Sequence, residues 1–553
     1  MARKILITAA LPYANGPLHI GHPRSTYLPA DVYARYCRLK GYDSVFICAT
    51  DEHGTPIEIK AQQEKKTPEE FVRIYRKRHL EDFEAFGVHF DNFYHTHSDE
   101  SRKLAEDFFK ASQEKGHIFK KKVEQTYCEK CGRFLPDRYV RGECPMCGAG
   151  DQYGDACEKC GKAYHAGTLK NPQCVVCRST PVRKEVEHDF FKLSAFKPFL
   201  EKYFAETKTL PSDVTNYLKN WLTDLQDWDI TRDGPYFGIK IPGEENKFFY
   251  VWWDAPIGYI SSTVNWAGRE HKSWESYWKN AEAELVHFIG KDIIYHHYLF
   301  WPAMLSDSGF RLPTRMPTRG YLNVEAEKMS KSRGIFILLR DFLDDYEPDF
   351  LRYYLTAITP NNITDGNFAW KEFQTKVNSE LIDAYCNFVF RALSFLKNKF
   401  DATVPEPGGF NERDEEFRRR TDALASEAEA DYENMEFKAA LEKIMAYSNE
   451  CNKYFNDAAP WKLVKEGKAA EARTALYLSL KAILAIATVS EPILPFTTRK
   501  VAAQLGVEKV KWNDYSGVKP GKKLGAAEIL YAKIEDAKID DELAKITPKE
   551  KPA

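Results

Sequence analysis

The sequence lacks a large net charge, because 79 lysine and arginine residues nearly balance 81 aspartate and glutamate residues and leave a formal charge of -2. A protein with almost no net charge has no overall electrostatic attraction for a polyanion. Contacts with nucleic acid must therefore come from local basic and aromatic patches. It also lacks any run of 18 apolar residues, and with a mean hydropathy of -0.51 this excludes a membrane span. No signal-peptide core precedes the first apolar run, so we expect a cytoplasmic location.

The 553 residues nevertheless contain enough apolar sequence for several cores. Residues 1–115 alternate apolar runs, such as 44–49, with charged helical stretches, such as 68–86, a pattern typical of a parallel sheet with crossover helices. Strand-like runs resume at 248–253 and 284–290. We therefore expect an α/β fold with a Rossmann-like doubly wound parallel sheet, its first half at 1–115 and its second at 231–348, split by an insertion at 116–230.

The C-terminal half has a different pattern. Residues 349–505 carry apolar side chains at helical spacing, including Phe437, Leu441, Ile444 and Met445, then Leu476, Leu480, Ile483 and Leu484. Such stripes predict the core of an all-α helical bundle domain. Residues 506–553 contain proline and glycine and are expected to form a C-terminal tail, with no appended oligomerisation domain, which favours a monomer.

Cysteine is concentrated in the insertion, where eight of the 12 cysteines form four CxxC pairs. Two such pairs supply four thiolates to one tetrahedral ion and favour zinc, so four pairs predict two structural Zn2+ ions. The spacing allows a nested arrangement, with the two middle pairs enclosed by the outer two, or sequential pairing; we favour the nested one. Metal would hold together an insertion too small to bury a sufficient core. The predicted ligands are Cys128, Cys131, Cys144, Cys147, Cys157, Cys160, Cys174 and Cys177.

Two separated segments predict one nucleotide site. His19-Ile20-Gly21-His22 follows the first apolar run and a turn rich in proline and glycine. A helix beginning there directs its N–H groups at an anion, Gly21 admits a close ligand, and both histidines can donate to phosphate. The second segment, residues 328–332 (Lys-Met-Ser-Lys-Ser), offers two ammonium groups and two hydroxyls in a loop flanked by glycines. Each segment alone is weak evidence for a nucleotide site, but their joint occurrence in this order predicts an ATP site.

The HIGH and KMSKS segments resemble the two signature motifs of the class I aminoacyl-tRNA synthetases. Longer stretches at residues 10–16, 51–56, 252–259, 290–292 and 300–305 resemble the methionyl-tRNA synthetase family of that class over essentially the whole chain. The resemblance implies activation of L-methionine with Mg2+ and ATP to methionyl-adenylate, with release of pyrophosphate. Transfer of methionine to the 3′ end of tRNA(Met) would follow, for initiation and elongation.

The resemblance also implies roles for particular residues. It assigns catalysis to His19, His22, Lys328 and Lys331, and ATP binding to the same four with Gly21, Gly290, Asp292 and Ser330. The methionine pocket would consist of Ala10, Leu11, Tyr13, Asp51, Trp252, Ala255, Pro256, Tyr259, His297 and Trp301. An aromatic pocket suits a polarizable thioether, and Asp51 suits the ammonium group. One departure is His296, which stands where the family often has Phe.

Recognition of the CAU anticodon is assigned, by the same resemblance, to Asn387, Arg391 and Trp461. The first two are four residues apart on an expected helix and so share a face, and an exposed tryptophan suits stacking on an unpaired base. The insertion is too short for a separate editing domain. Three other interpretations remain open: a different class I synthetase, a small-molecule nucleotidyltransferase, and a non-catalytic RNA-binding protein.

Overall fold

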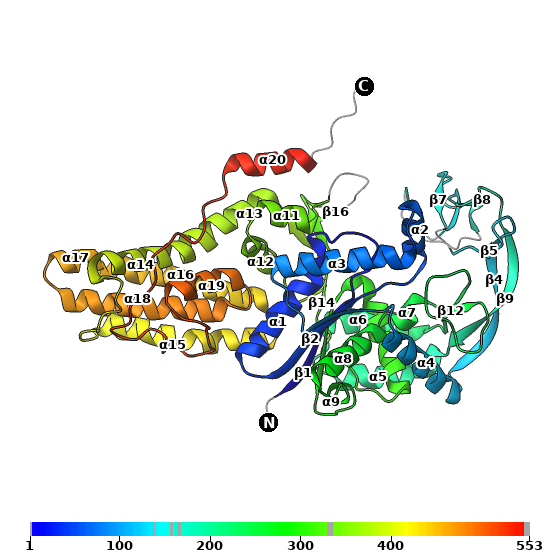
Figure 1. The fold of residues 1–553 in the computed structure, drawn as a ribbon, viewed down its shortest axis with the longest axis horizontal. Coiled ribbons are helices and arrows are strands. Elements are labelled where there is room, and N and C mark those ends of the chain that lie inside the picture. The colour runs from blue at the N-terminus through cyan, green and yellow to red at the C-terminus, as the bar shows by residue number, and fades with distance from the viewer. Residues whose placement is uncertain are drawn as a thin grey trace, which may run out of the picture.

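The computed structural model of the protein describes residues 3–136, 139–154, 157, 159–160, 162, 168–328 and 336–546. At its centre lies a five-stranded sheet with the order β14-β13-β1-β2-β3, in which every pairing is parallel (Figure 1). The strands are β1 (Lys4–Ala9), β2 (Asp43–Thr50), β3 (Asn92–His95), β13 (Glu284–Gly290) and β14 (Thr318–Arg319). The chain order reverses between β1 and β13, so the carboxyl end of β1 lies at the position where such sheets bind ligands.

Helices cover both faces of this sheet. Ile5 and Ile7 pack in one cluster with α1 (Leu28–Leu39), whereas Leu6 packs in a second cluster with α8 (Ile257–Glu270). Strands buried on both faces need continuous apolar runs, which explains the pattern of β1. The other helices of this half are α2 (Thr55–Gln63), α3 (Pro68–Phe86), α4 (Asp99–Glu114), α5 (Lys197–Glu206), α6 (Ser212–Thr223), α7 (Val251–Asp254), α9 (Glu275–Trp278), α10 (Trp301–Asp307), α11 (Leu339–Asp345) and α12 (Pro348–Ala357), with short turns η1 (Pro23–Tyr27), η4 (Leu193–Phe196), η5 (Lys291–Ile293) and η6 (His296–Phe300).

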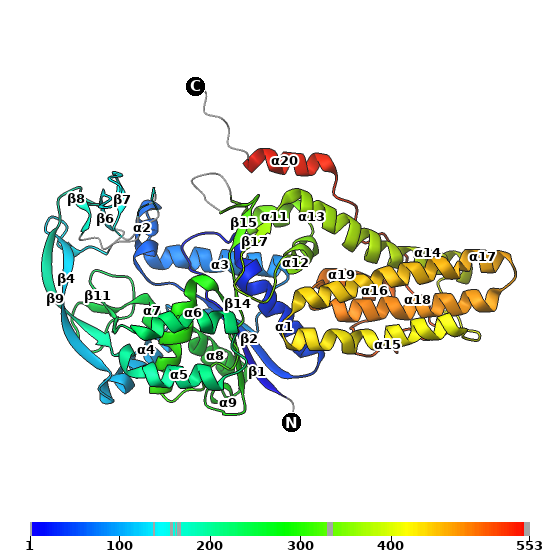
Figure 2. The ribbon, with the colours of Figure 1, turned by 180° about the vertical axis from the view of Figure 1, so that it is seen from behind.

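The predicted fold class is confirmed, and the insertion extends away from the sheet at the end opposite the helical bundle (Figures 1 and 2). Its base is a long antiparallel pair, β4 (Ile118–Cys128) and β9 (Val182–Phe191), with β5 (Arg133–Phe134) and β10 (Trp228–Asp229) at the edges. A second small sheet contains β6 (Val140–Glu143), β7 (Gln152–Tyr153) and β8 (Lys170–Cys174). The predicted domain boundaries stay predictions.

One strand expectation was wrong. Of residues 248–253, only the start belongs to a strand, β12 (Lys247–Phe249), which pairs with β11 (Thr231–Asp233). The Trp253 N–H donates to the Tyr250 carbonyl at 2.7 Å and begins the turn of α7. Residues 248–253 are all apolar, so they show neither the alternation of a strand nor the spacing of a helix. Periodicity alone therefore cannot distinguish the two structures for such a run. A further small sheet, β15 (Leu322–Val324), β16 (Glu327–Lys328) and β17 (Gly366–Phe368), follows the central sheet.

The C-terminal half is a helical bundle, as predicted, and the eight apolar residues named above are all buried in one cluster. Its elements are α13 (Trp370–Lys376), η7 (Val377–Cys386), α14 (Asn387–Phe400), α15 (Glu412–Glu433), α16 (Phe437–Ala458), α17 (Pro460–Lys465), α18 (Ala469–Ser490) and α19 (Pro495–Gln504). Among the described helices, α18 is long and apolar enough to cross a membrane, but 83% of its apolar stretch is buried, as in a core helix.

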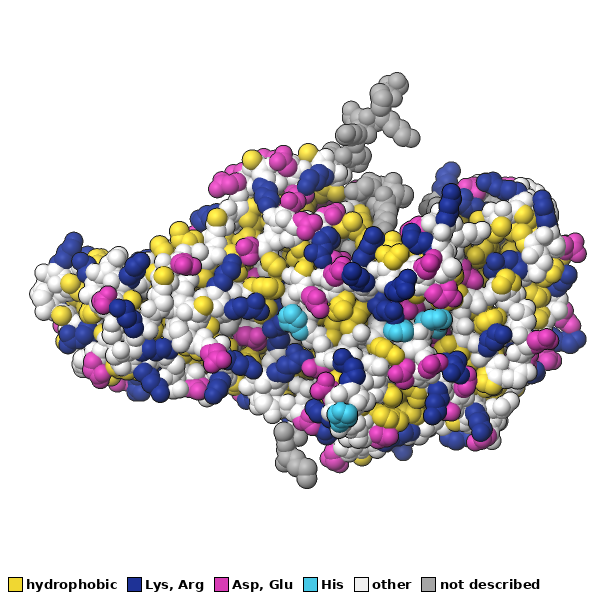
Figure 3. Space-filling view, viewed as in Figure 1, with side chains coloured by type: hydrophobic (Ala, Val, Ile, Leu, Met, Phe, Trp, Pro, Cys, Tyr) yellow, Lys and Arg dark blue, Asp and Glu magenta, His cyan; other side chains and the backbone are white. Residues whose placement is uncertain are grey.

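The expected tail is anchored to the rest of the protein. Residues 506–535 run along the bundle without helix or strand, and Leu530 and Tyr531 are buried in the bundle cluster. The chain then returns to α13 as α20 (Asp536–Ile546), where Lys371 of α13 pairs with Asp540 at 2.7 Å (Figure 1). Side chains of both charge signs are interspersed over this face of the molecule, in keeping with the small net charge (Figure 3).

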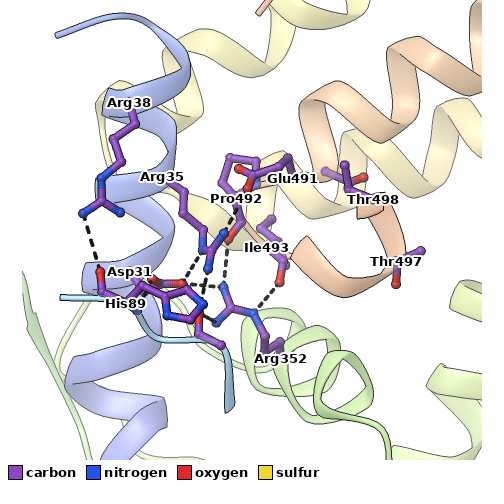
Figure 4. Close-up of polar contacts among 12 residues, drawn as sticks. Asp31, Arg35, Arg38, His89, Arg352, Glu491, Pro492, Ile493, Thr497 and Thr498 are labelled. Atoms are coloured by element: carbon purple, nitrogen blue, oxygen red, sulfur yellow. Dashed lines mark hydrogen bonds and ion pairs between the residues drawn. The ribbon is translucent and has the colours of Figure 1, made fainter. Parts of the chain in front are cut away.

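The bundle joins the part of the chain that contains the central sheet through a buried ionic network (Figure 4). Arg352 of α12 pairs with Asp31 of α1 at 2.8 Å and donates to the backbone carbonyl of Ile493, beyond α18, at 2.8 Å. Arg35, one turn beyond Asp31 on α1, pairs with Glu491 at 2.9 Å. Because α1 continues the helix that starts in the HIGH segment, this network ties that segment to the bundle.

Candidate active site, zinc clusters and anticodon surface

The HIGH segment begins a helix at the carboxyl end of β1, as predicted. The Gly21 N–H donates to His19 Nδ1 at 3.1 Å, and the His19 N–H donates to His22 Nδ1 at 3.0 Å. The two imidazole rings lie 3.8 Å apart. A neutral His19 ring whose Nδ1 accepts a hydrogen bond carries its proton on Nε2, which makes Nε2 the donor.

The HIGH segment contacts residues that come shortly after the KMSKS segment in the sequence. The Ile20 N–H donates to the Ile337 carbonyl at 3.1 Å, and the His19 ring lies 5.0 Å from the ring of Phe336. Residues 336–338, which follow the KMSKS segment in the sequence, therefore lie beside the HIGH segment. Lys328 ends β16, where its backbone pairs with Asn323. Ser330 and Lys331 lie outside the described residues.

A cavity of about 1010 Å³ opens beside the HIGH segment. It is lined by residues from the ends of β1, β2 and β13 and from α7 and α8. Among the predicted site residues, those that line it are Ala10, Leu11, Tyr13, His22, Asp51, Trp252, Ala255, Pro256, Tyr259, Gly290, Asp292 and His297. Trp301 lies one layer behind, fully buried, and its Nε1 donates to His287 Nε2 at 3.3 Å.

Asp51 offers an acceptor for a cation in this cavity. Its Oδ1 is buried and has no hydrogen-bond partner among the described residues. Burial, with the nearby carboxylate of Asp254 adding to it, raises the pKa of Asp51 well above the usual range. A buried carboxylate without a partner is costly, and an ammonium group bound beside it would remove that cost.

The aromatic walls of the cavity are held by a hydrogen-bond chain. His297 Nδ1 lies 3.1 Å from the Ile293 carbonyl, which requires a proton on Nδ1 and leaves Nε2 to accept from the Tyr259 hydroxyl at 2.8 Å. Burial lowers the pKa of His297 to about 4, so the ring is neutral at pH 7. The Tyr259 hydroxyl is thus fixed in one direction, and both rings form rigid walls.

His296, the departure from the family pattern, stacks on Trp252 with ring centroids 3.6 Å apart. Burial, and then its neighbour His297, lowers the pKa of His296 to about 3. A neutral imidazole stacked face to face occupies the wall as an aromatic ring would, so the substitution keeps the wall flat.

Two glycines shape the cavity edge. Gly54 has φ +109°, and a Cβ there would meet the Tyr13 hydroxyl at 3.0 Å. At Gly290, a Cβ would meet the Asp292 carboxylate at 2.5 Å, so only glycine lets that carboxylate fold over the strand end.

The cavity extends toward the insertion along residues that sequence reasoning missed. His188 lies between Asp229 and Asp233, at 2.8 Å from each carboxylate. Between these acids in sequence, Arg232 places its guanidinium 3.9 Å from the centroid of the Tyr250 ring. The residues of this group all line the cavity: His188, Asp229, Arg232, Asp233 and Tyr250. No sequence pattern could find them, because β9 and the 229–233 segment meet only in the folded chain.

The eight cysteines form two clusters, and the grouping is the nested one. Cys128, Cys131, Cys174 and Cys177 form the outer cluster, and Cys144, Cys147, Cys157 and Cys160 form the inner cluster. In each, all four sulfurs lie within 4.8 Å of one another, with closest pairs at 3.4 to 3.9 Å. A tetrahedral zinc ion with Zn–S bonds of about 2.3 Å separates its sulfurs by about 3.8 Å, so both clusters fit zinc.

The predicted anticodon residues meet at one place on the bundle. Arg391 of α14 donates to the Asn456 side chain at 2.6 Å, and its guanidinium lies 6.0 Å from the centroid of the Trp461 ring. Asn387 is exposed one turn earlier on the same helix, and Trp461 is partly exposed. A cation and an indole side by side on a surface suit an unpaired base.

A parallel sheet with paired histidines at its switch point, joined to a helical bundle, defines a class I aminoacyl-tRNA synthetase. A family profile described as tRNA synthetases class I (M) matches residues 5–393, and one described as the anticodon-binding domain of methionyl tRNA ligase matches residues 404–550. The chain belongs to the methionyl-tRNA synthetase family.

Individual relatives agree with this assignment. Methionine–tRNA ligase of Methanobrevibacter smithii is 43% identical over 97% of this chain and 81% of its own. That of Methanosphaera stadtmanae is 40% identical over 98% of this chain and 82% of its own. A crystal structure of Mycobacterium tuberculosis methionyl-tRNA synthetase bound by methionyl-adenylate matches with a TM-score of 0.80 at 25% identity, covering 96% of this chain and 100% of that one.

Proposed function

We propose that the protein is a ligase that joins L-methionine to tRNA(Met) in two steps at the cavity below the HIGH segment. The observation that carries the proposal is the carboxylate of Asp51, whose buried Oδ1 has no hydrogen-bond partner among the described residues, in an aromatic cavity next to His19 and His22. Such a cavity provides an anion for the amino acid's ammonium group, flat walls for a thioether, and donors for phosphate.

In the first step, the methionine carboxylate attacks the α-phosphorus of ATP, and pyrophosphate leaves. Asp51 would hold the ammonium group, while Trp252, His297 and Tyr259 would hold the side chain; Trp301 would support them from behind. Ala10, Leu11, Tyr13, Ala255 and Pro256 would complete the pocket. Since no protein nucleophile is needed, catalysis rests on positioning and on charge neutralisation.

For the nucleotide, we assign the α-phosphate to His19 and His22, and the β- and γ-phosphates to Lys328, Ser330 and Lys331. Gly21, Gly290 and Asp292 would bind the adenosine. Magnesium enters with ATP as part of the substrate and offsets the charge of the phosphates. The contact of residues 336–338 with the HIGH segment supports a single site for both motifs.

In the second step, the terminal ribose hydroxyl of the tRNA attacks the methionyl carbonyl, and AMP leaves. Asn387, Arg391 and Trp461 would read the CAU anticodon at the far end of the bundle. The two cysteine clusters would each hold a structural zinc ion, with four thiolates that leave no position for a substrate. From sequence alone, we also propose a monomer in the cytoplasm.

The first experiment is pyrophosphate exchange into ATP, with each of the 20 amino acids in turn and without tRNA. We expect exchange driven chiefly by methionine. Exchange driven by another amino acid would still indicate a class I synthetase but would contradict specificity for methionine. No exchange with any amino acid would favour a non-catalytic RNA-binding protein.

A further inference from the structure

Exposed aromatic rings gather near the mouth of the catalytic cavity. Eight large apolar side chains are exposed in the part of the chain that the structure describes, and three of them are Tyr217 (50% exposed), Trp221 (42%) and Tyr321 (42%). Large rings are rarely left in water without a reason, and an exposed aromatic group with a polar rim marks a binding surface.

Helix α6 presents two of these rings outward. Tyr217 and Trp221 are four residues apart, so they share one face, and their ring centroids lie 6.4 Å apart. Val214, Leu218 and Leu222 occupy the buried face of the same helix. The orientation of α6 is therefore set by its apolar side, and the exposure of both rings is a property of the fold.

A continuous series of ring contacts connects this surface to the methionine pocket. Trp221 lies 4.6 Å from Tyr295, and Tyr295 lies 5.2 Å from Trp228. Trp228 lies 4.9 Å from His296, which stacks on Trp252 in the cavity wall. The exposed rings are thus the outer end of the wall that holds the amino acid.

Tyr321 lies two residues beyond Arg319 of β14, whose backbone pairs with the cavity residue Gly290. The Lys291 ammonium lies 4.6 Å from the centroid of its ring and pairs with Asp365 at 2.6 Å. Burial, followed by the charges of Asp292, Asp365 and Tyr217, raises the pKa of Tyr321.

Hydrogen bonds connect α6 with Tyr321. The Asp213 carboxylate, in the first turn of α6, accepts from the Ile363 N–H at 3.2 Å. Two residues further on, Asp365 accepts from the Tyr321 N–H at 2.7 Å. The short segment between them therefore fixes α6 relative to Tyr321 and holds the three rings in a constant arrangement.

We propose that Tyr217, Trp221 and Tyr321 form a stacking platform for the unpaired 3′ nucleotides of the tRNA acceptor end. The proposal rests on the proposed function, which requires a single-stranded RNA end to reach this cavity. Aromatic rings stack on any base, and the Lys291 ammonium adds a cation near the RNA backbone. A protein partner on these rings would block the mouth that the RNA end must enter, so RNA is the favoured occupant.

The test compares two RNAs and several proteins. We would measure the Kd of tRNA(Met) with and without its unpaired 3′ nucleotides for wild type, Trp221→Ala, Trp221→Phe and Tyr217→Ala, with Ile529→Ala as a control because that side chain is 69% exposed on the C-terminal segment. A stacked base contributes roughly five- to a hundredfold in affinity. We expect wild type, Ile529→Ala and Trp221→Phe to prefer the intact RNA at least fivefold, and the two alanine variants to prefer it less than twofold.

An equal preference for intact RNA in wild type and both alanine variants would overturn the platform. Tyr217→Ala keeps the test decisive if Trp221→Ala fails to fold, because Trp221 and not Tyr217 contacts Tyr295. A change of oligomeric state in the variants, with the preference unchanged, would instead assign the rings to contact with a second copy of the chain. Absence of methionine-dependent exchange in wild type would overturn the proposed function itself, which separates the two failures.

Discussion

The carboxylate of Asp31 and the guanidinium of Arg352 lie 2.8 Å apart, and neither side chain has any exposed surface (Figure 4). Burial alone would raise the pKa of Asp31, but Arg35 and Arg352 hold it below the usual range. Arg352 also donates to the carbonyls of Pro492 and Ile493. One pair of side chains thus links the helix of the HIGH segment to the helical bundle.

Asp31→Asn should destabilise the protein by about 3 kcal/mol or more, because it leaves the Arg352 charge buried without its counter-ion. The loss should be smaller in Asp31→Asn with Arg352→Met, because the Arg352 charge that lost its partner is then removed as well. Because the folded pKa of Asp31 is depressed, its stabilising effect is present above about pH 4 and is lost as the pH falls further. Chemical denaturation at pH 7 and at about pH 2 measures all three effects, and additive losses in the double variant would contradict the coupling.

Asp51→Asn should weaken methionine binding by about 100-fold, since an amide keeps the shape of the side chain but loses the charge that binds an ammonium group. In wild type, affinity should rise with pH as Asp51 loses its raised-pKa proton, and the variant should lack this dependence. Calorimetric titration with methionine between pH 5 and 8 provides the measurement. Asp43→Asn, at the exposed start of β2, the strand that ends just before Asp51, is the control and should bind methionine as wild type does.

Zinc content distinguishes the nested clusters from sequential pairing. Cys131→Ser and Cys147→Ser each remove one thiolate, from the outer and the inner cluster respectively. We expect about two zinc ions per wild-type chain, one in each single variant and none in the double variant. Sequential pairing would place both cysteines in one site, and the double variant would then retain one ion. Elemental analysis of dialysed protein decides between these outcomes.

Trp461→Ala should leave methionine-dependent pyrophosphate exchange within about twofold of wild type and reduce tRNA charging by at least about tenfold, since a stacked base is lost. The residual charging should no longer distinguish a CAU anticodon from an altered one. Parallel measurement of exchange and of charging kcat/KM tests this. An equal loss in both assays would mean that Trp461 supports the bundle core instead.

His188 should make stability depend on pH. Burial alone would lower its pKa, but hydrogen bonds to Asp229 and Asp233 raise it to about 9, which stabilises the fold by about 3 kcal/mol. A raised pKa contributes its full effect below the unfolded value of about 6.5, and the effect disappears as the pH rises through 9. We therefore expect His188→Gln to be less stable than wild type at pH 6, with the difference shrinking toward pH 9. A difference that stays constant between these pH values would show that His188 is not held as a cation.

Local patterns predicted much of this protein because the forces behind them act over short stretches of chain. The continuous apolar run of β1, the helix over residues 68–86 and the apolar stripes of α16 and α18 each follow from burial at a fixed period. The CxxC spacing likewise predicted metal binding, because two thiolates three residues apart face one ion wherever the loop lies.

The sequence by itself thus determined the sheet, the bundle, the candidate zinc ligands and the family. Only the tertiary structure decided which cysteine pairs share a cluster, that residues 251–254 form a helical turn, that His296 stacks on Trp252, and that Arg232 and His188 reach the cavity. It also showed that the C-terminal segment returns to α13. Each of these depends on contacts between residues far apart in the chain, and no local period or spacing carries that information.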